Sequence, residues 1–285
     1  MRAYLPALEL VAPPDLDGAL ALLGGGEHRA LAGGTDLMVL AEAGKLPGRR
    51  FVSLWQLDAL RGIEASAGGG VRLGALTTYT DVRRSALLAE RWPLLARAAA
   101  ETGGIAIQNR GTIGGNIANA SPAADTPPAL LVYDAELELV STAGTRRVPY
   151  AGFHHGYRQM DLQPGELIAG VHLPAREPGW RDAYRKVGTR RAQAISKLCF
   201  AGALRLDGDR IVDVRLGWGS VAPVPLRASA TEAVLQGERL SPALARAAQQ
   251  ALGAELRPID DFRSTAGYRM RVAQNLLGDW LLAGR

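Results

Sequence analysis

The chain has 285 residues, 47% of them hydrophobic, and carries 33 Lys and Arg against 28 Asp and Glu, for a formal net charge of +5. This length accommodates two domains at the usual ~100–200 residues each. The single cysteine, Cys199, excludes an internal disulfide and an iron–sulfur cluster held by thiolates of this chain. No apolar run approaches the ~20 residues of a membrane span, and no arginine-rich run indicates a nucleic-acid partner. We therefore expect a cytoplasmic globular protein.

The first part of the chain predicts short strands alternating with helices. A strand within 1–12 precedes a helix over 16–23, for which Asp15 is the expected N-cap. A strand over 29–32 then runs into a glycine loop. The helix expected after this loop has an apolar face that includes Met38, which we predict to pack in the core.

Further strands and helices follow up to residue 173. A strand over 51–54 precedes a hairpin of strands 63–67 and 71–75, joined by three glycines. Two helices are expected next, and then two strands, with the ranges 81–88, 92–101, 136–141 and 165–173.

The last third reads as a separate unit that begins near Gly179 and Trp180. It contains a run of predicted strands followed by a run of predicted helices, which is typical of an α+β layer. The expected strands are 184–187, 194–206, 211–217 and 220–223, and the expected helices are 230–235, 242–252 and 267–282.

Two glycine-rich loops are the strongest functional signals. The first is AGGTDL at 32–37, and the second is NRGTIGGNIANASPAAD at 109–125. Glycine allows a ligand to approach the backbone closely, and consecutive amides can form an anion-binding nest. We expect a diphosphate between the loops, with Asp125 available for ribose or base hydroxyls. An ordinary glycine turn remains the alternative for either loop alone, and neither loop matches a Walker A or GxGxxG motif.

The sequence shows no catalytic apparatus. His154 and His155 are adjacent, which disfavours chelation of one metal ion, so we expect packing rather than a zinc site. Cys199 lies in an apolar run, which is typical of a buried, inert thiol.

Several ordered motifs resemble one family along nearly the whole chain. AGGTDL and TIGGNIANASPAAD resemble the two FAD-contacting motifs of the flavoprotein (medium) subunit of molybdenum hydroxylases, of the xanthine dehydrogenase and aerobic carbon monoxide dehydrogenase type. PGELI at 164–168 resembles the end of the flavin domain of that family, and the segment from Lys186 to Lys197 resembles the start of its C-terminal domain.

The resemblance implies a fold and a division into domains. The fold is α+β, with a two-lobed FAD-binding domain of the vanillyl-alcohol-oxidase/MurB-like type over 1–176, whose lobes are roughly 1–56 and 57–176. A C-terminal α+β domain of the carbon monoxide dehydrogenase flavoprotein type, with an antiparallel sheet and a helical bundle, is implied for 179–285.

The resemblance also implies a cofactor, partners and a site. Electrons would pass from iron–sulfur clusters of a small partner subunit through noncovalent FAD to NAD or a quinone, while a large partner subunit holds the molybdenum–pterin. A dimer of heterotrimers is expected, and xanthine dehydrogenase-like membership is favoured. No residue of this chain is assigned a catalytic or metal-binding role. The residues implied to line FAD are Leu31, Ala32, Gly33, Gly34, Thr35, Asp36, Leu37, Thr112, Gly114, Gly115, Asn116, Asn119, Asp125, Ile168 and Lys186.

One departure and two alternatives qualify this assignment. Where the family usually has Gln-Ile-Arg-Asn, this chain has AIQN at 106–109, so the usual arginine contact is missing or is supplied by Arg110. A self-contained FAD-dependent oxidase or reductase of the same fold group is the first alternative, and it would need a substrate base or a covalent flavin. The second is a scaffold subunit that has lost its cofactor, against which the intact glycine loops argue.

Overall fold

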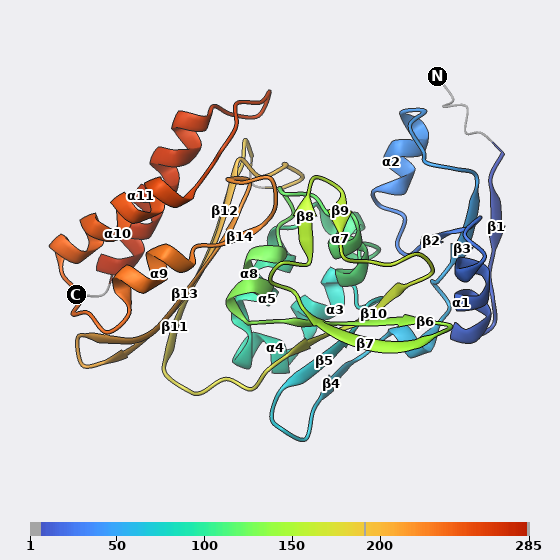
Figure 1. Ribbon diagram of the computed structural model, residues 1–285, viewed down its shortest axis with the longest axis horizontal. Helices are drawn as coiled ribbons and strands as arrows, with labels where there is room; N and C mark the ends of the chain where they lie inside the picture. Colours follow the sequence, from blue (N-terminus) through green and yellow to red (C-terminus); the bar gives the residue numbers. More distant parts are fainter. Residues whose placement is uncertain (1–6, 191, 284–285) are drawn as a thin grey trace.

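The computed structural model describes residues 7–190 and 192–283, and its elements follow the chain from one end of the molecule to the other (Figure 1). A small lobe at the N-terminal end leads to a central lobe, and the C-terminal sheet with its helices lies on the far side. Within the described ranges, no helix is both long and apolar enough to cross a membrane.

The N-terminal lobe is a three-stranded parallel sheet with strand order β1-β3-β2. Parallel neighbours need crossover connections, and two helices supply them. The Asp15 side chain accepts a hydrogen bond of 2.8 Å from the N–H of Gly18, which confirms the predicted N-cap. Met38 is 46% exposed, so its expected place in the core is wrong. The elements are β1 (Glu9–Val11), α1 (Leu16–Gly24), β2 (Arg29–Leu31), α2 (Leu37–Glu42) and β3 (Arg50–Ser53).

The central lobe is built on a five-stranded sheet with strand order β4-β5-β10-β6-β7, in which all neighbours are antiparallel. The predicted hairpin forms β4 and β5, as expected from the three glycines between them. A separate two-stranded ribbon lies beside the sheet. The strands are β4 (Ile63–Ala65), β5 (Val71–Gly74), β6 (Glu136–Ser141), β7 (Gly144–Pro149), β8 (His154–Gly156), β9 (Gln159–Met160) and β10 (Leu167–Leu173).

Short helices cover one face of this sheet. The predicted helix over 81–88 is two helices, because Ser85 ends the first and caps the second by accepting a hydrogen bond of 3.2 Å from Leu88 N–H. The 130–133 segment, which sequence reasoning did not assign to a strand or a helix, lies largely in a helix that starts with two prolines. The helices are η1 (Asp58–Leu60), α3 (Tyr79–Arg84), α4 (Ala86–Arg91), α5 (Pro93–Glu101), α6 (Ile105–Gln108), α7 (Ile113–Ala118) and α8 (Pro127–Val132).

The C-terminal unit is an antiparallel sheet, β11-β12-β13-β14, backed by three helices. Its core includes Phe200 and Trp218, whose rings stack with centroids 4.5 Å apart. The expected strand over 220–223 is wrong, because Ser220 has a φ of 64° and turns the chain out of the sheet. The elements are β11 (Trp180–Val187), β12 (Leu198–Asp207), β13 (Arg210–Gly219), β14 (Leu226–Arg227), α9 (Ser229–Leu235), α10 (Pro242–Glu255) and α11 (Ala266–Leu282).

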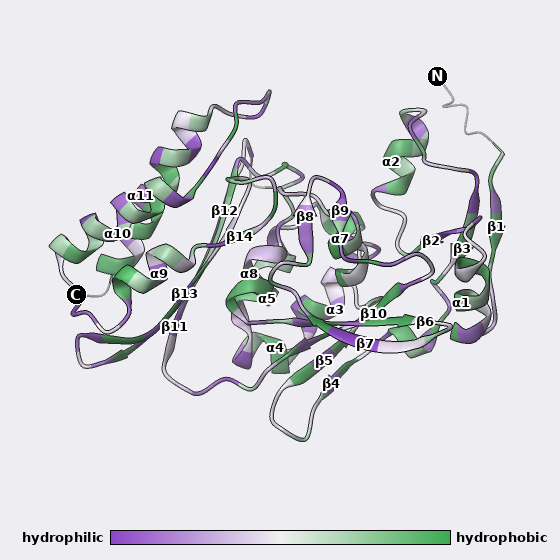
Figure 2. Ribbon diagram, in the orientation of Figure 1, coloured by the Kyte–Doolittle hydropathy of each residue, from purple (hydrophilic) through white to green (hydrophobic). Residues whose placement is uncertain are grey.

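The central lobe and the C-terminal sheet share a packed interface. Helix α8 lies against β12 and β13, and hydrophobic residues run along both α8 and β12 (Figure 2). At the connection between the two units, the Arg176 guanidinium donates two hydrogen bonds of 2.9 and 2.8 Å to the Asp182 carboxylate and lies 4.7 Å from the centre of the Tyr133 ring. The α+β class, with a C-terminal antiparallel sheet and helices, is confirmed.

Candidate functional site

The first glycine loop joins β2 to α2 and contacts the second loop through its backbone. A Cβ atom added to Gly33 would lie only 1.7 Å from the carbonyl oxygen of Arg110, so a side chain at this position would force the loops apart. Gly34 has a φ of 76°, which favours glycine. The backbone N–H groups of Gly33, Gly34, Thr35 and Asp36 donate to no residue within the described ranges, and so they remain available to a ligand.

The second loop uses most of its amides to hold itself in place. The N–H groups of Ile113 and Gly114 donate to the carbonyls of Thr77 and Ala75, at 3.0 and 2.9 Å. The N–H of Gly115 donates to the Thr112 hydroxyl at 3.1 Å, and this bond caps α7. The expectation that both loops offer their amides to a diphosphate therefore applies mainly to the first loop.

Gly115 brings α7 close to the first loop. A Cβ atom added to Gly115 would lie 3.9 Å from the Cβ of Ala32, which is ordinary van der Waals contact. Asn116 accepts a hydrogen bond from the Thr126 hydroxyl, and Asn119 ends α7 with a half-buried side chain. The structure thus places the first loop beside the start of α7, through the contacts of Gly33 with Arg110 and of Ala32 with Gly115.

Arg110 stacks on an aromatic ring that sequence reasoning missed. Its guanidinium lies 3.7 Å from the centre of the Trp55 ring, and the guanidinium of Arg61 lies 4.7 Å from the same ring centre. Cation–π contacts of this kind stabilise by about 0.5–1 kcal/mol when partly exposed. The stack holds the second loop against the segment that follows β3, and only the three-dimensional structure places Trp55 there.

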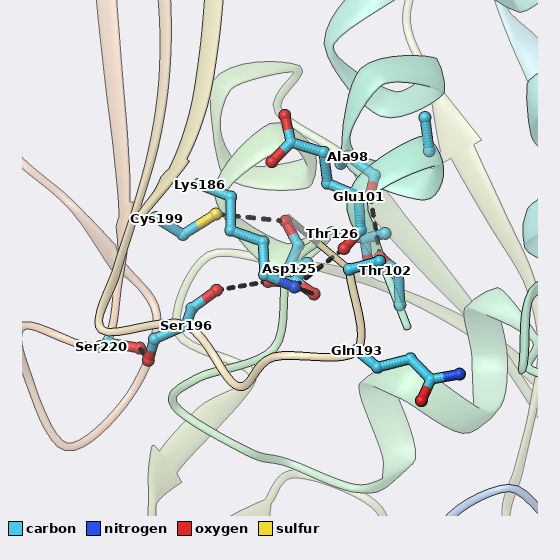
Figure 3. A network of polar contacts seen from close by, with 12 residues as sticks. Ala98, Glu101, Thr102, Asp125, Thr126, Lys186, Gln193, Ser196, Cys199 and Ser220 are labelled. Atoms are coloured by element: carbon cyan, nitrogen blue, oxygen red, sulfur yellow. Dashed lines mark hydrogen bonds and ion pairs between the residues drawn. The ribbon is translucent and has the colours of Figure 1, made fainter. Parts of the chain in front are cut away.

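Asp125 lies in a buried polar network with residues of the C-terminal unit (Figure 3). Its Oδ2 is 2.7 Å from Lys186 Nζ, and its Oδ1 accepts a hydrogen bond of 2.6 Å from the Ser196 hydroxyl. Lys186 also donates to the carbonyl of Glu101 at 2.8 Å. The two charged side chains are 10% and 6% exposed for Asp125 and Lys186. The carboxylate expected to meet ribose or base hydroxyls is therefore already engaged on both oxygens.

Burial and the ion pair act on Asp125 in opposite directions. Burial raises the pKa of the Asp125 carboxyl above its usual range, and the Lys186 ammonium and the Ser196 hydroxyl oppose this rise. The neighbouring Tyr184 hydroxyl donates to the carbonyl of Asp125 at 3.0 Å. The second glycine loop, residues 109–125 and hereafter the central loop, is thus bound to β11 through two separate residues, Lys186 and Tyr184.

Ile168 lies in the core beneath α7. Its side chain is 3% exposed on β10 and belongs to the same core cluster as Ile113 and Ile117 of α7. Helix α7 packs against β10. Ile168 therefore supports the second loop from within the core.

The expected packing role is confirmed for His154 and Cys199, whereas His155 is exposed, so packing is wrong for that residue. His154 is buried, contacts the carbonyl of Ile117 at 3.0 Å through Nε2, and packs edge-to-face against Tyr150 and Phe153. Burial lowers the pKa of His154 and raises that of the fully buried Cys199 thiol. Within 7–190 and 192–283, no group of His, Cys, Asp and Glu is arranged to hold a metal ion.

Family models match both units. Residues 6–176 match the FAD binding domain in molybdopterin dehydrogenase, and residues 182–283 match the CO dehydrogenase flavoprotein C-terminal domain. The chain is thus a flavoprotein of the oxidoreductase class. It belongs to the family of FAD-binding medium subunits of molybdopterin hydroxylases, the xanthine dehydrogenase and CO dehydrogenase family.

Individual relatives cover nearly the whole chain. It is 31% identical to the xanthine dehydrogenase FAD-binding subunit of Escherichia coli O157:H7, over 88% of this chain and 86% of that protein. It is 32% identical to the glyceraldehyde dehydrogenase medium chain of Sulfolobus acidocaldarius, over 96% of each. A solved structure of carbon monoxide dehydrogenase from Hydrogenophaga pseudoflava superposes with a TM-score of 0.92 at 31% identity, covering 96% of each chain.

Proposed function

We propose that this medium subunit binds FAD noncovalently between its two glycine loops and passes electrons from iron–sulfur clusters of a partner subunit to NAD or a quinone. The contact between Gly33 and the Arg110 backbone carries the proposal, because it leaves the unused amides of the first loop beside α7. When bound, FAD supplies the chemistry of accepting two electrons together and releasing them singly.

The residues of this chain have distinct roles in the proposal. The amides of 33–36 bind the diphosphate, since they have no acceptor among the described residues and consecutive amides of such a turn can form an anion-binding nest. Asn116 and Asn119 present polar side chains from α7, with Leu31, Ala32, Leu37, Thr112, Gly114 and Gly115 as the remaining wall. We propose that the main role of Lys186 is to hold the Asp125 side chain in place, because its ammonium lies 2.7 Å from that carboxylate.

The proposal extends to the complex. We infer a small iron–sulfur subunit and a large molybdenum subunit as partners, in a cytoplasmic dimer of heterotrimers. Relatives described as medium chains or FAD-binding subunits support this inference. The TIGGNI segment and the Lys186 segment favour a xanthine dehydrogenase-like complex. We place the domain division between residues 176 and 179, within the interval that the two family models leave unmatched.

Flavin release from variants tests the binding site. We expect the wild-type chain to yield free FAD after denaturation, and Gly33→Ala to lose at least tenfold in FAD affinity because its Cβ cannot coexist with the Arg110 carbonyl. Gly68→Ala is the matched control, since a Cβ at Gly68 meets nothing within 4 Å. Equal FAD affinity in the two variants would refute the site. A flavin that stays on the denatured chain would point to a self-contained oxidase.

Reduction under anaerobic conditions tests the acceptor. Bleaching of the bound flavin by NADH, monitored in the visible spectrum, would support a nicotinamide-linked complex. Reoxidation of chemically reduced flavin by a quinone, without bleaching by NADH, would support a quinone acceptor instead.

A further inference from the structure

A buried arginine in the C-terminal helices has no role in the site described so far. Arg269 on α11 is 2% exposed, and its guanidinium donates to Ser220 O at 2.8 Å and to Asp261 Oδ1 at 2.6 Å. Its Nε has no partner among the described residues. Burying a charge with incomplete hydrogen bonding is unfavourable, so the position requires an explanation beyond packing.

Ser220 connects Arg269 to the central loop. The N–H of Ser220 donates to the carbonyl of Pro122 at 2.8 Å, and its hydroxyl donates to the carbonyl of Ser196 at 3.0 Å. Ser196 in turn donates to Asp125, and Figure 3 shows these three side chains, of Ser220, Ser196 and Asp125, in succession. A continuous chain of hydrogen bonds therefore runs from α11 to both ends of the segment 122–125.

The conformation of Ser220 depends on this chain. Its φ of 64° lies in the left-handed region, which is unfavourable for a residue other than glycine. Such conformations persist where the surroundings hold them in place. Here Arg269 binds the Ser220 carbonyl, while Pro122 and Ser196 bind its N–H and hydroxyl.

We propose that Arg269 is a positioning residue for the FAD site. By holding Ser220, it fixes the segment 122–125 and the adjacent Thr126, whose hydroxyl donates to Asn116, a residue proposed to face FAD. The C-terminal domain thereby sets the affinity for the cofactor. This inference rests on the proposed position of FAD between the glycine loops.

Arg176 offers a matched control for a purely structural role. It is also a largely buried arginine at the junction of the two units, bound to Asp182, and it donates to the carbonyl of Arg91 at 3.2 Å. None of its described contacts reaches the segment 122–125. A loss of general stability should therefore affect Arg176 and Arg269 variants alike, whereas a positioning effect on FAD should be confined to Arg269.

The experiment measures FAD affinity and thermal stability of the full chain in parallel. Deflavinated Arg269→Met and Arg176→Met proteins are titrated with FAD by flavin fluorescence, and their melting temperatures are compared without FAD. We expect Arg269→Met to weaken FAD binding at least tenfold, and Arg269→Lys, which can still donate to one acceptor, to restore part of it. Arg176→Met should remain within twofold of wild type. FAD affinity within twofold of wild type for Arg269→Met, or equal losses in both Met variants, would overturn the proposal.

Milder variants keep the test decisive if Arg269→Met does not fold. Ser220→Gly relieves the left-handed strain while removing the hydroxyl, so it should weaken FAD binding several-fold without a lower melting temperature. Ser196→Ala removes the hydrogen bond to Asp125 and should also weaken FAD binding several-fold. Unchanged affinity in both would overturn the proposal. If Gly33→Ala leaves FAD binding intact as well, the proposed site itself has failed.

Discussion

The ion pair between Lys186 and Asp125 leads to a quantitative prediction for the protein without FAD. Replacing Lys186 with Met leaves the Asp125 carboxylate, 10% exposed, without the ammonium that lies 2.7 Å from it. Removing one partner of a buried pair costs about 3–5 kcal/mol, because the remaining charge is desolvated and uncompensated. We expect a loss of this size in the free energy of unfolding, measured by urea denaturation with tryptophan fluorescence.

A double-mutant cycle separates the ion pair from the packing of the two side chains. Asp125→Asn leaves the Lys186 ammonium with the Glu101 carbonyl as acceptor, whereas Lys186→Met with Asp125→Asn removes both charges. We expect the double variant to be more stable than the sum of the single losses indicates, with a coupling of about 2 kcal/mol. Lys45→Met, at an exposed position, is the control and should change stability by less than about 0.5 kcal/mol.

The pH dependence gives a second test of the same pair. Burial raises the pKa of Asp125 in the wild-type protein, and Lys186 opposes this rise. Without Lys186 the pKa rises further, so the folded variant retains a proton that the unfolded chain, with a pKa of about 3.9, has released. The stability deficit of Lys186→Met should therefore shrink as the pH falls from about 8 to about 5. Additive single losses, together with a deficit that is equal at both pH values, would refute this account of the pair.

Two further predictions concern groups outside the central loop. Hydrogen bonding to Arg72 is the largest cause that lowers the pKa of Glu138 from 4.5 to about 2, so Glu138 stabilises the fold above pH ~4.5 and loses this contribution as the pH falls toward 2. Glu138→Gln should lower the free energy of unfolding in urea by about 1–2 kcal/mol at pH 7 and by clearly less at pH 3. An equal loss at both pH values would contradict the assignment. Burial raises the pKa of the Cys199 thiol, so the native chain should react with a thiol reagent at pH 8 only at the rate of unfolding, and rapid labelling of the folded protein would show that the thiol is accessible.

Local signals in the sequence predicted most elements because capping and turn chemistry act over a few residues. Asp15 caps α1 as expected, and the three glycines after Ala67 join the predicted hairpin. The predicted elements are wrong where one polar residue changes the direction of the backbone. Ser85 divides one predicted helix into two, and the left-handed conformation of Ser220 ends a predicted strand.

Long-range contacts of the site were outside the reach of sequence reasoning. Asp125 and Lys186 are 61 positions apart in the sequence. Trp55 and Arg110, which stack on one another, are likewise distant in the sequence. The glycine motifs identified both loops, yet only the structure shows that the N–H groups of Ile113 and Gly114 donate hydrogen bonds to neighbouring backbone carbonyls. The family resemblance of the segment from Lys186 to Lys197 was the signal for Lys186, and no pattern pointed to Arg269.

The hydrogen bonds of the central loop connect the flavin domain to the C-terminal domain. Lys186, Ser196 and Ser220 each reach across from the C-terminal unit to residues 122–125. A fragment ending at residue 176 would lose all three partners, and Asp125 would keep its place in the sequence without its geometry. In the proposed site, the glycine loops therefore supply the amides for an anion, whereas hydrogen bonds from the C-terminal unit hold residues 122–125 in place.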